Sequence, residues 1–207
     1  MVSGTRDALI EAAALLLDQG GVEAVTLREV GRQVGVSHNA PYKHFAGKEA
    51  LLAAIAAREL VRRDAALAAT IKRGKSPEAA LRAAMHDYVA WALRSPARFK
   101  LVFGAWSIDS EELSAAAHAA QTALVDLVAA TQQTGALPAG DPVRLTSLIR
   151  ALAHGAADLA FAGHLAADGK GNASPDQLVD DLFDHLSRRG PGGAGSGRVR
   201  HGGGSRG

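Results

Sequence analysis

The chain has 207 residues, 47% hydrophobic and 4% aromatic, and its 23 Lys and Arg residues nearly balance its 21 Asp and Glu residues. The formal charge of +2 excludes a uniformly basic coat for nucleic acid, and the lack of cysteine excludes disulfides, thiolate nucleophiles and cysteine-based metal sites. No apolar run reaches the about 18 residues of a membrane span, and the first residues are not typical of a signal peptide. We therefore expect a cytoplasmic protein without membrane contact. Its alanine-rich, aromatic-poor composition predicts an all-helical fold.

Nine helices are predicted from apolar periodicity, capping residues and the glycines between them. Four helices start where a capping side chain precedes proline, because the cap accepts a first-turn N–H and proline at that position loses no helical hydrogen bond. These starts are Ser76-Pro77, Ser95-Pro96, Asp141-Pro142 and Ser174-Pro175. The expected helices span residues 5–19, 27–34, 38–44, 48–72, 77–93, 96–105, 111–133, 142–167 and 175–188.

The first three predicted helices form a cluster with one polar member. Leu9 and Leu16 belong to an apolar stripe on the first helix, and Leu27 and Val30 to one on the second, so these two helices pack on each other. A short turn through Gly35 then leads to a helix too polar for a core. Two helices joined in this way, with a polar second member, are typical of helix-turn-helix DNA readers.

The third helix, residues 38–44, is the candidate reading element, with Ser37 as its cap. Its outward side chains can address base edges or phosphates; they are His38, Asn39, Tyr42 and Lys43. Tyr42 and Phe45 have an alternative role as core aromatics. Residues 26–48 also predict a local cationic face, although scattered surface charge explains the same counts. The basic residues of this stretch are Arg28, Arg32, Lys43 and Lys48, and its one acidic residue is Glu29.

This region contains three spaced sequence motifs in a fixed order: Thr26–Gly31 (TLREVG), Val34–Ser37 (VGVS) and Pro41–Leu51 (PYKHFAGKEAL). The series closely resembles the signature of TetR-family transcriptional regulators, and the similarity covers about residues 5–55. It implies a dimer that binds a palindromic operator and leaves it when a small molecule enters a carboxy-terminal helical domain. Pro41 departs from the pattern, since the family more often has Leu there.

The resemblance also implies roles for individual residues. By position, Thr26 and Lys48 are phosphate contacts. The implied reading surface is His38, Asn39, Tyr42, Lys43 and His44. Together with Arg28 and Ser37, these residues make up the predicted DNA-binding set.

Helix 142–167 carries two adjacent stripes, one apolar and one mixed, so it must be covered on two sides. Helix 175–188 offers a partner stripe. We predict an intermolecular four-helix interface, which is also what the resemblance implies; burial in the chain's own core is the alternative. The predicted interface residues are Leu148, Leu152, Gly155, Ala156, Leu159, Gly163, Leu178, Leu182 and Phe183.

Aromatic residues with a few polar tips gather in the carboxy-terminal half, which suits an organic ligand. The predicted effector-binding residues are Tyr88, Trp91, Phe99, Phe103, Trp106, His118, His154 and Phe161. Each of them taken singly is also explained as core.

Metal binding is weighed separately. His154 with Asp158, and His164 with Asp168, have the i, i+4 spacing of metal ligands, but neither pair shows a third ligand, so we expect no metal and no cofactor. Residues 94–100 and 152–155 resemble the TetR subgroup marked by a Trp-His-Gly motif, although Ala153 replaces its Trp.

The sequence thus predicts three parts: a helix-turn-helix DNA-binding domain (1–50), a helical effector-binding and dimerisation domain (51–188) and a disordered Gly/Arg-rich tail (189–207). We predict a ligand-responsive homodimeric repressor, with double-stranded operator DNA and a small organic effector as partners. A small all-helical enzyme is one alternative, against which stands the lack of P-loop and HExxH motifs. A DNA-binding protein without an effector is the other.

Overall fold

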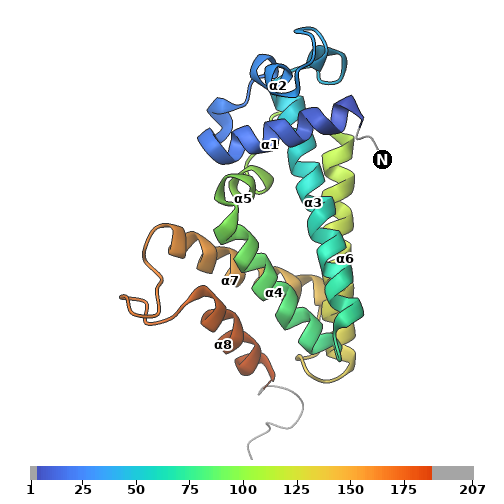
Figure 1. Cartoon of the computed structure of the whole chain (residues 1–207). Helices are drawn as coiled ribbons and strands as arrows, with labels where there is room; N and C mark the ends of the chain where they lie inside the picture. Colours follow the sequence, from blue (N-terminus) through green and yellow to red (C-terminus); the bar gives the residue numbers. More distant parts are fainter. Residues whose placement is uncertain (1–3, 188–207) are drawn as a thin grey trace, which may run out of the picture.

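The computed structural model describes residues 4–187, and every regular element in that range is helical. The order is α1 (Thr5–Ala24), α2 (Leu27–Val34), the 3-10 helix η1 (Pro41–Lys43), α3 (Lys48–Arg73), α4 (Pro77–Arg94), α5 (Pro96–Val102), α6 (Glu111–Gln133), α7 (Pro142–Phe161) and α8 (Pro175–Ser187). α1 and α2 lie at one end of the molecule and α7 and α8 toward the other, with α3 and α6 side by side between them (Figure 1). The all-helical prediction is confirmed. The predicted disordered tail lies outside the described residues.

Local capping explains where the helices begin. Each of four capping side chains accepts a hydrogen bond from a first-turn backbone N–H, at distances of 2.8 to 3.3 Å; they are Ser76, Ser110, Asp141 and Ser174. α5 also begins at its proline, Pro96, but the Ser95 side chain accepts no bond from that helix. The four predicted proline starts are therefore confirmed, three of them with the expected cap.

The end of α7 corrects the sequence prediction. The helix ends at Phe161 and not at residue 167, because Gly163 adopts a left-handed φ of 71°. The N–H of His164 then bonds to the carbonyl of Leu159 at 2.9 Å, and the N–H of Gly163 to that of Ala160 at 3.0 Å. This pair of bonds closes a helix. Gly163 is therefore a terminator.

Two other predicted ends also differ. α1 continues past residue 19 to Ala24, across a break at Gly20 and Gly21 whose backbone is non-helical. These glycines mark a kink, since Gly21 has a φ of 68° and helical hydrogen bonding resumes after it. α5 ends at Val102 instead of residue 105.

Two hydrophobic clusters hold the helices together. The first joins α1, α2 and α3 to α5 and to parts of α4 and α6, and it fully buries Leu17, Ile55 and Phe99. The second joins α4, α6, α7 and α8 and fully buries Leu81 and Phe183. α3 packs against both clusters, so it is common to the two parts of the molecule.

α6 is the one helix within residues 4–187 that is long and apolar enough to cross a membrane. Such a helix is weak evidence for a span, because core helices of soluble proteins share these properties. Here α6 packs along α3 and against α4 and α7, which uses part of its apolar surface within the fold.

A polar clamp holds α8 on α4 beside the second cluster. Arg82 donates hydrogen bonds to Asp180 at 2.9 Å and to Asp184 at 2.8 Å. The His86 ring lies 2.9 Å from Asp176 through Nδ1 and 2.9 Å from Asp180 through Nε2. Both ring nitrogens therefore face carboxylates, an arrangement that favours the imidazolium.

We expect this clamp to weaken as pH rises. Partial burial lowers the pKa of the His86 imidazole, but the bonds and charges of Asp176 and Asp180 outweigh it and hold the pKa above its ordinary value of 6.5. The stabilisation is then complete below pH 6.5 and is lost as pH rises through the folded-state pKa, while Arg82 stays charged. Urea midpoints at about pH 6 and about pH 8 should differ more in the wild type than in His86→Gln. Equal pH dependence in both proteins contradicts the clamp.

Candidate nucleic-acid interface and ligand cavity

Backbone chemistry fixes α2 and the turn that follows it. Thr26 caps α2 by accepting the N–H of Glu29 at 3.2 Å. At the other end Gly35 adopts φ 74° and ψ 27°, a left-handed conformation that glycine takes without strain. The N–H of Val36 then bonds to the Gly31 carbonyl at 3.1 Å. α2 therefore ends in a tight turn at the predicted glycine.

The predicted reading helix, residues 38–44, is corrected by the structure. A turn closed by the Ala40 N–H on the Ser37 carbonyl, at 2.9 Å, leads into the single 3-10 turn of η1. The cause is Pro41, which has no N–H to donate back to Ser37 and so prevents the α-helical bond there. Ala40 has φ −61° and ψ −44°, so the segment still winds as one compact right-handed turn.

Two buried residues anchor this turn, which we call the reading turn (residues 37–44), on the helices beside it. Phe45 is 4% exposed, and the Arg6 guanidinium of α1 lies over its ring at 5.4 Å. Pro41 is buried against Gly31 of α2, where a Cβ would come within 3.0 Å of the proline ring. Gly31 thus permits the close approach that seats the reading turn on α2.

The reading turn follows α2 at one end of the molecule (Figure 1), and most of its side chains are polar and exposed. The exposed members of the predicted DNA-binding set are Thr26, Arg28, Ser37, His38, Asn39, Tyr42, Lys43 and His44. Tyr42 is 53% exposed, and the His38 ring stands edge-on to it with centroids 5.9 Å apart. Thr26, Arg28 and His38 also border one surface hollow, so the structure brings α2 residues of the set next to the reading turn.

Some of the basic side chains on this surface form ion pairs and others do not. Arg32 and Lys48 pair with glutamates, at 2.6 Å and 3.6 Å. Arg28 and Lys43 are exposed and form no ion pair within residues 4–187. The predicted cationic face therefore reduces to two unpaired cations that flank the polar side chains.

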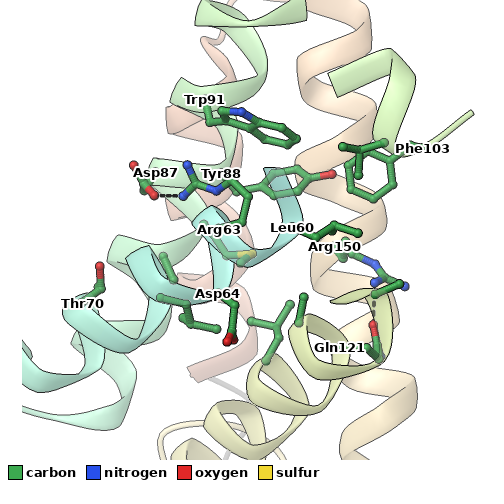
Figure 2. Close-up of a pocket in the computed structure, with 17 residues that line it drawn as sticks. Leu60, Arg63, Asp64, Thr70, Asp87, Tyr88, Trp91, Phe103, Gln121 and Arg150 are labelled. Carbon is green, nitrogen blue, oxygen red and sulfur yellow. Dashed lines mark hydrogen bonds and ion pairs between the residues drawn. The ribbon is translucent and has the colours of Figure 1, made fainter. Parts of the chain in front are cut away.

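A cavity of about 230 Å³ lies between α3, α4, α6 and α7 (Figure 2). Three of the predicted effector-binding residues line it: Tyr88, Trp91 and Phe103. Apolar side chains such as Leu60 of α3 and Leu124 of α6 extend the wall. The lining is mostly apolar with a few polar groups, as ligand cavities commonly are.

Three more of the predicted residues support this wall from behind. The Phe99 ring centroid lies 4.6 Å from that of His154 and 5.9 Å from that of Phe161, and it contacts the Tyr88 ring at 5.9 Å. Phe99 is 1% exposed. Phe99 is therefore core, His154 and Phe161 are half-buried beside it, and none of the three lines the cavity.

The structure does not bring Trp106 and His118 to the cavity. Trp106 follows α5 and packs beside α1, where it lines a separate hollow with Leu17. His118 is exposed on α6, one residue after Ala117, which does line the cavity. The step of about 100° per residue in an α-helix turns the next side chain away.

A hydrogen bond to His154 fixes the Tyr88 hydroxyl. Burial raises the pKa of the Tyr88 phenol well above its ordinary value, so the phenol stays neutral, and its oxygen lies 3.0 Å from His154 Nδ1. The other ring nitrogen of His154 lies 3.6 Å from an Asp158 carboxylate oxygen. The bond to His154 thus orients Tyr88. No group of three metal-ligating side chains occurs in the described part of the chain.

α5 connects the cavity to the amino-terminal helices through two adjacent residues. Phe99 supports the cavity wall, and Arg98 bonds to Asp18 of α1 at 2.6 Å and to Glu59 of α3 at 3.0 Å. Arg62 holds the same Glu59 carboxylate at 3.0 Å, and that side chain is 5% exposed. A displacement of α5 therefore acts directly on both α1 and α3.

Part of the predicted dimer interface lies on an open face of α7 and α8. Leu148 and Leu159 are 52% and 47% exposed. The half-buried positions of the set are Leu152, Gly155, Leu178 and Leu182. Exposed leucines on one helix face are a feature of protein–protein contacts.

The remaining members of that set are placed differently. Ala156 and Phe183 are 3% and 0% exposed and belong to the chain's own core, because they point to the side of α7 and α8 that packs inward. Gly163 ends α7 and does not line a helix face. For Ala156 and Phe183 the alternative of burial in the chain's own core holds, and the helix-face position predicted for Gly163 is wrong.

Sequence reasoning misses the charged side chains of the cavity. They are Arg63, Asp64, Asp87 and Arg150. Each is a charge on a helix that is otherwise partly apolar, and in a sequence such residues are indistinguishable from those that face solvent. Only the packing of α3, α4 and α7 around the cavity brings them to one place.

Comparison with known families gives two matches along the chain. Residues 9–55 match the family described as bacterial regulatory proteins, tetR family, and residues 81–186 match a tetracyclin repressor-like C-terminal domain. The first match covers α2, η1 and most of α1, and the second includes the cavity wall from α4 to α7.

Individual proteins agree with these matches. The uncharacterized HTH-type transcriptional regulator YobS of Bacillus subtilis (strain 168) is 30% identical over 96 residues, 46% of this chain and 50% of YobS, so the match spans about half of that curated relative. A structure from Rhodococcus sp. RHA1, of a protein with unknown function, has a TM-score of 0.78 and 31% identity, covering 90% of this chain and 95% of that one. AibR in complex with isovaleryl coenzyme A and operator DNA shares the fold, with a TM-score of 0.64 and 18% identity over 88% and 97% of the chains.

Proposed function

The chain belongs to the tetR family of bacterial transcriptional regulators, and from that premise we propose that it is a cytoplasmic repressor that binds a palindromic operator as a homodimer. Residues 1–50 would bind DNA, and residues 51–188 would bind an effector and form the dimer. The observation that carries the proposal is the reading turn. Its polar side chains are exposed together, beside the unpaired cations Arg28 and Lys43.

The geometry of the reading turn suits a major groove. Pro41 and Phe45 hold it on α2 and α1, so its orientation is set before DNA arrives and little entropy is lost on binding. Arg28 and Lys43 supply the salt-dependent attraction to phosphates. Asn39 and the histidines supply donors and acceptors for base edges.

The exposed face of α7 and α8 supports the dimer. Leu148 and Leu159 are about three helical turns apart on one side of α7 and need an apolar partner. A second copy meets that need by symmetry, since a two-fold axis places the same face opposite itself. Two reading turns could then enter successive major grooves about 34 Å apart.

The cavity supports effector control. It lies against α3, which begins beside the reading turn, and its wall rests on α5, which holds α1 and α3 through Arg98. A ligand that favours a different position of α5 or α3 shifts the population toward a reading-turn spacing that fits the operator less well. A coupling of about 1–3 kcal/mol suffices for an allosteric response.

Selection of bound sequences from random duplex DNA tests the proposal. The purified protein should enrich a palindrome with half-sites about one helical turn apart. Enrichment of an unrepeated site would contradict the homodimer on DNA. The absence of enrichment at low ionic strength, where phosphate contacts are strongest, would overturn the DNA-binding function itself.

A further inference from the structure

The cavity wall carries four charged side chains whose charges are not all neutralised. Arg63 pairs with Asp87, and its guanidinium lies 5.4 Å from the Trp91 ring centroid. These two residues therefore neutralise each other on the side formed by α3 and α4. The remaining two charges are Asp64 on α3 and Arg150 on α7 (Figure 2).

Arg150 lacks an acidic partner. Its guanidinium donates to the Gln121 amide oxygen of α6 at 2.5 Å, and no carboxylate within residues 4–187 forms an ion pair with it. A guanidinium has five N–H donors and keeps its charge in proteins, so the contact with Gln121 leaves most of its binding capacity unused. Partial burial without a counter-ion is unfavourable, and a bound anion relieves it.

The other groups near Arg150 also suit an anion in this position. Gln121 holds the guanidinium in place, and Tyr88 keeps its hydroxyl neutral, so neither adds a negative charge at this end. Asp64 comes from α3 and is drawn apart from Arg150, near the centre of Figure 2. A ligand with a negative group at each end would meet repulsion there, so a single negative charge fits better.

The volume limits the rest of the ligand. An apolar cavity of about 150 Å³ accommodates benzene, and sites for drug-sized ligands start near 300 Å³. At about 230 Å³ this cavity suits one ring or a short alkyl chain with a small polar group. Leu60, Leu67 and Phe103 provide apolar contacts for such a body.

We propose that the cavity binds a small organic monocarboxylate, with its carboxylate on Arg150 and its apolar body between α3 and α4. This inference rests on the proposed function in taking the cavity as the effector site. A planar guanidinium binds a carboxylate through two parallel hydrogen bonds, which selects it over an amide or an amine of the same shape.

Calorimetric titration with matched ligand sets tests this assignment. Phenylacetate, hexanoate and cyclohexanecarboxylate are each compared with the amide and the amine of the same carbon skeleton. At least one acid should bind the wild type about 10-fold or more tightly than its amide and amine, as expected for a charge-assisted bidentate contact. If each acid binds no better than its amide, or if an amine binds best, the proposal is overturned.

Two variants locate the selectivity. Arg150→Gln should reduce the preference for the acid to within about 2-fold of the amide while leaving amide binding unchanged, which also shows that the variant is folded. Arg94→Gln removes the same group from an exposed position on α4 and should keep the wild-type preference. A preference that survives in Arg150→Gln overturns the role of this arginine.

The acid that binds is then added to the protein–operator complex, so that two failures can be told apart. If it binds with the expected selectivity but leaves DNA affinity unchanged, the ligand class stands and the effector part of the proposed function fails. If operator binding is intact and no acid is preferred, only the ligand class fails.

Discussion

Replacing Asn39 and Lys43 together by alanine is expected to lower operator affinity about 1000-fold or more. Both side chains are exposed on the reading turn and form no side-chain hydrogen bond or ion pair within residues 4–187, so their removal should leave the fold intact. Each base or phosphate contact contributes about 1–3 kcal/mol, and a homodimer loses four of them. Anisotropy titration with the selected operator measures the loss. The salt dependence should also become shallower, since phosphate contacts release counter-ions.

The control for this variant removes the same chemical groups at the far end of the molecule. Lys72→Ala combined with Gln133→Ala takes an ammonium and an amide from the exposed last turns of α3 and α6. Its operator affinity should stay within about 2-fold of the wild type, because surface charges beyond a Debye length are screened. Equal losses in the two double variants would show that net charge, and not the reading turn, governs DNA binding.

Introducing glutamate at both Leu148 and Leu159 is expected to convert the proposed dimer to a monomer and to weaken operator binding about 100- to 10,000-fold. In the proposed two-fold dimer the α7 face of one copy packs against the same face of the other. The variant would therefore bury four carboxylates opposite each other in an apolar interface. DNA binding falls because two linked half-site contacts become independent, and linkage typically contributes this range of avidity. Sedimentation velocity reports the assembly state, and titration with the operator reports the affinity.

Leu93→Glu is the matched control for that experiment. Leu93 is 40% exposed on α4, outside the predicted interface, so the same substitution there should leave a dimer with wild-type affinity. Thermal unfolding of all three proteins separates loss of assembly from loss of fold. A dimer that persists in the Leu148→Glu, Leu159→Glu variant would place the interface on another surface.

The sequence predicts helix starts better than helix ends. Starts such as those at Ser76 and Asp141 depend on a side chain bonding to its own first turn, which is visible in a few consecutive residues. The end of α7 depends on a left-handed glycine, and Gly163 has two interpretations in sequence, as a close-packing residue or as a terminator. The apolar residues that follow Gly163 favour the interpretation as a close-packing residue, which is wrong.

The two candidate sites differ in predictability for a related reason. The reading turn is contiguous, so most of its residues follow from a linear motif; only its hydrogen bonding differs, because Pro41 lacks an N–H. The cavity is assembled from four helices. Residue type alone identifies Tyr88 and Phe103 but also selects His118. That side chain points away from the cavity, because it lies one position after the lining residue Ala117 on α6.

α3 runs without interruption for 26 residues, from Lys48 next to the reading turn to Arg73 near the start of α4. At about 1.5 Å per residue it is a rod of about 39 Å with no internal hinge. A tilt of about 5° around one end therefore moves the other end by about 3 Å, and in a two-fold assembly the separation of the reading turns can change by about twice that amount. A ligand that is small relative to the protein can in this way alter the fit of both half-sites through mechanical amplification.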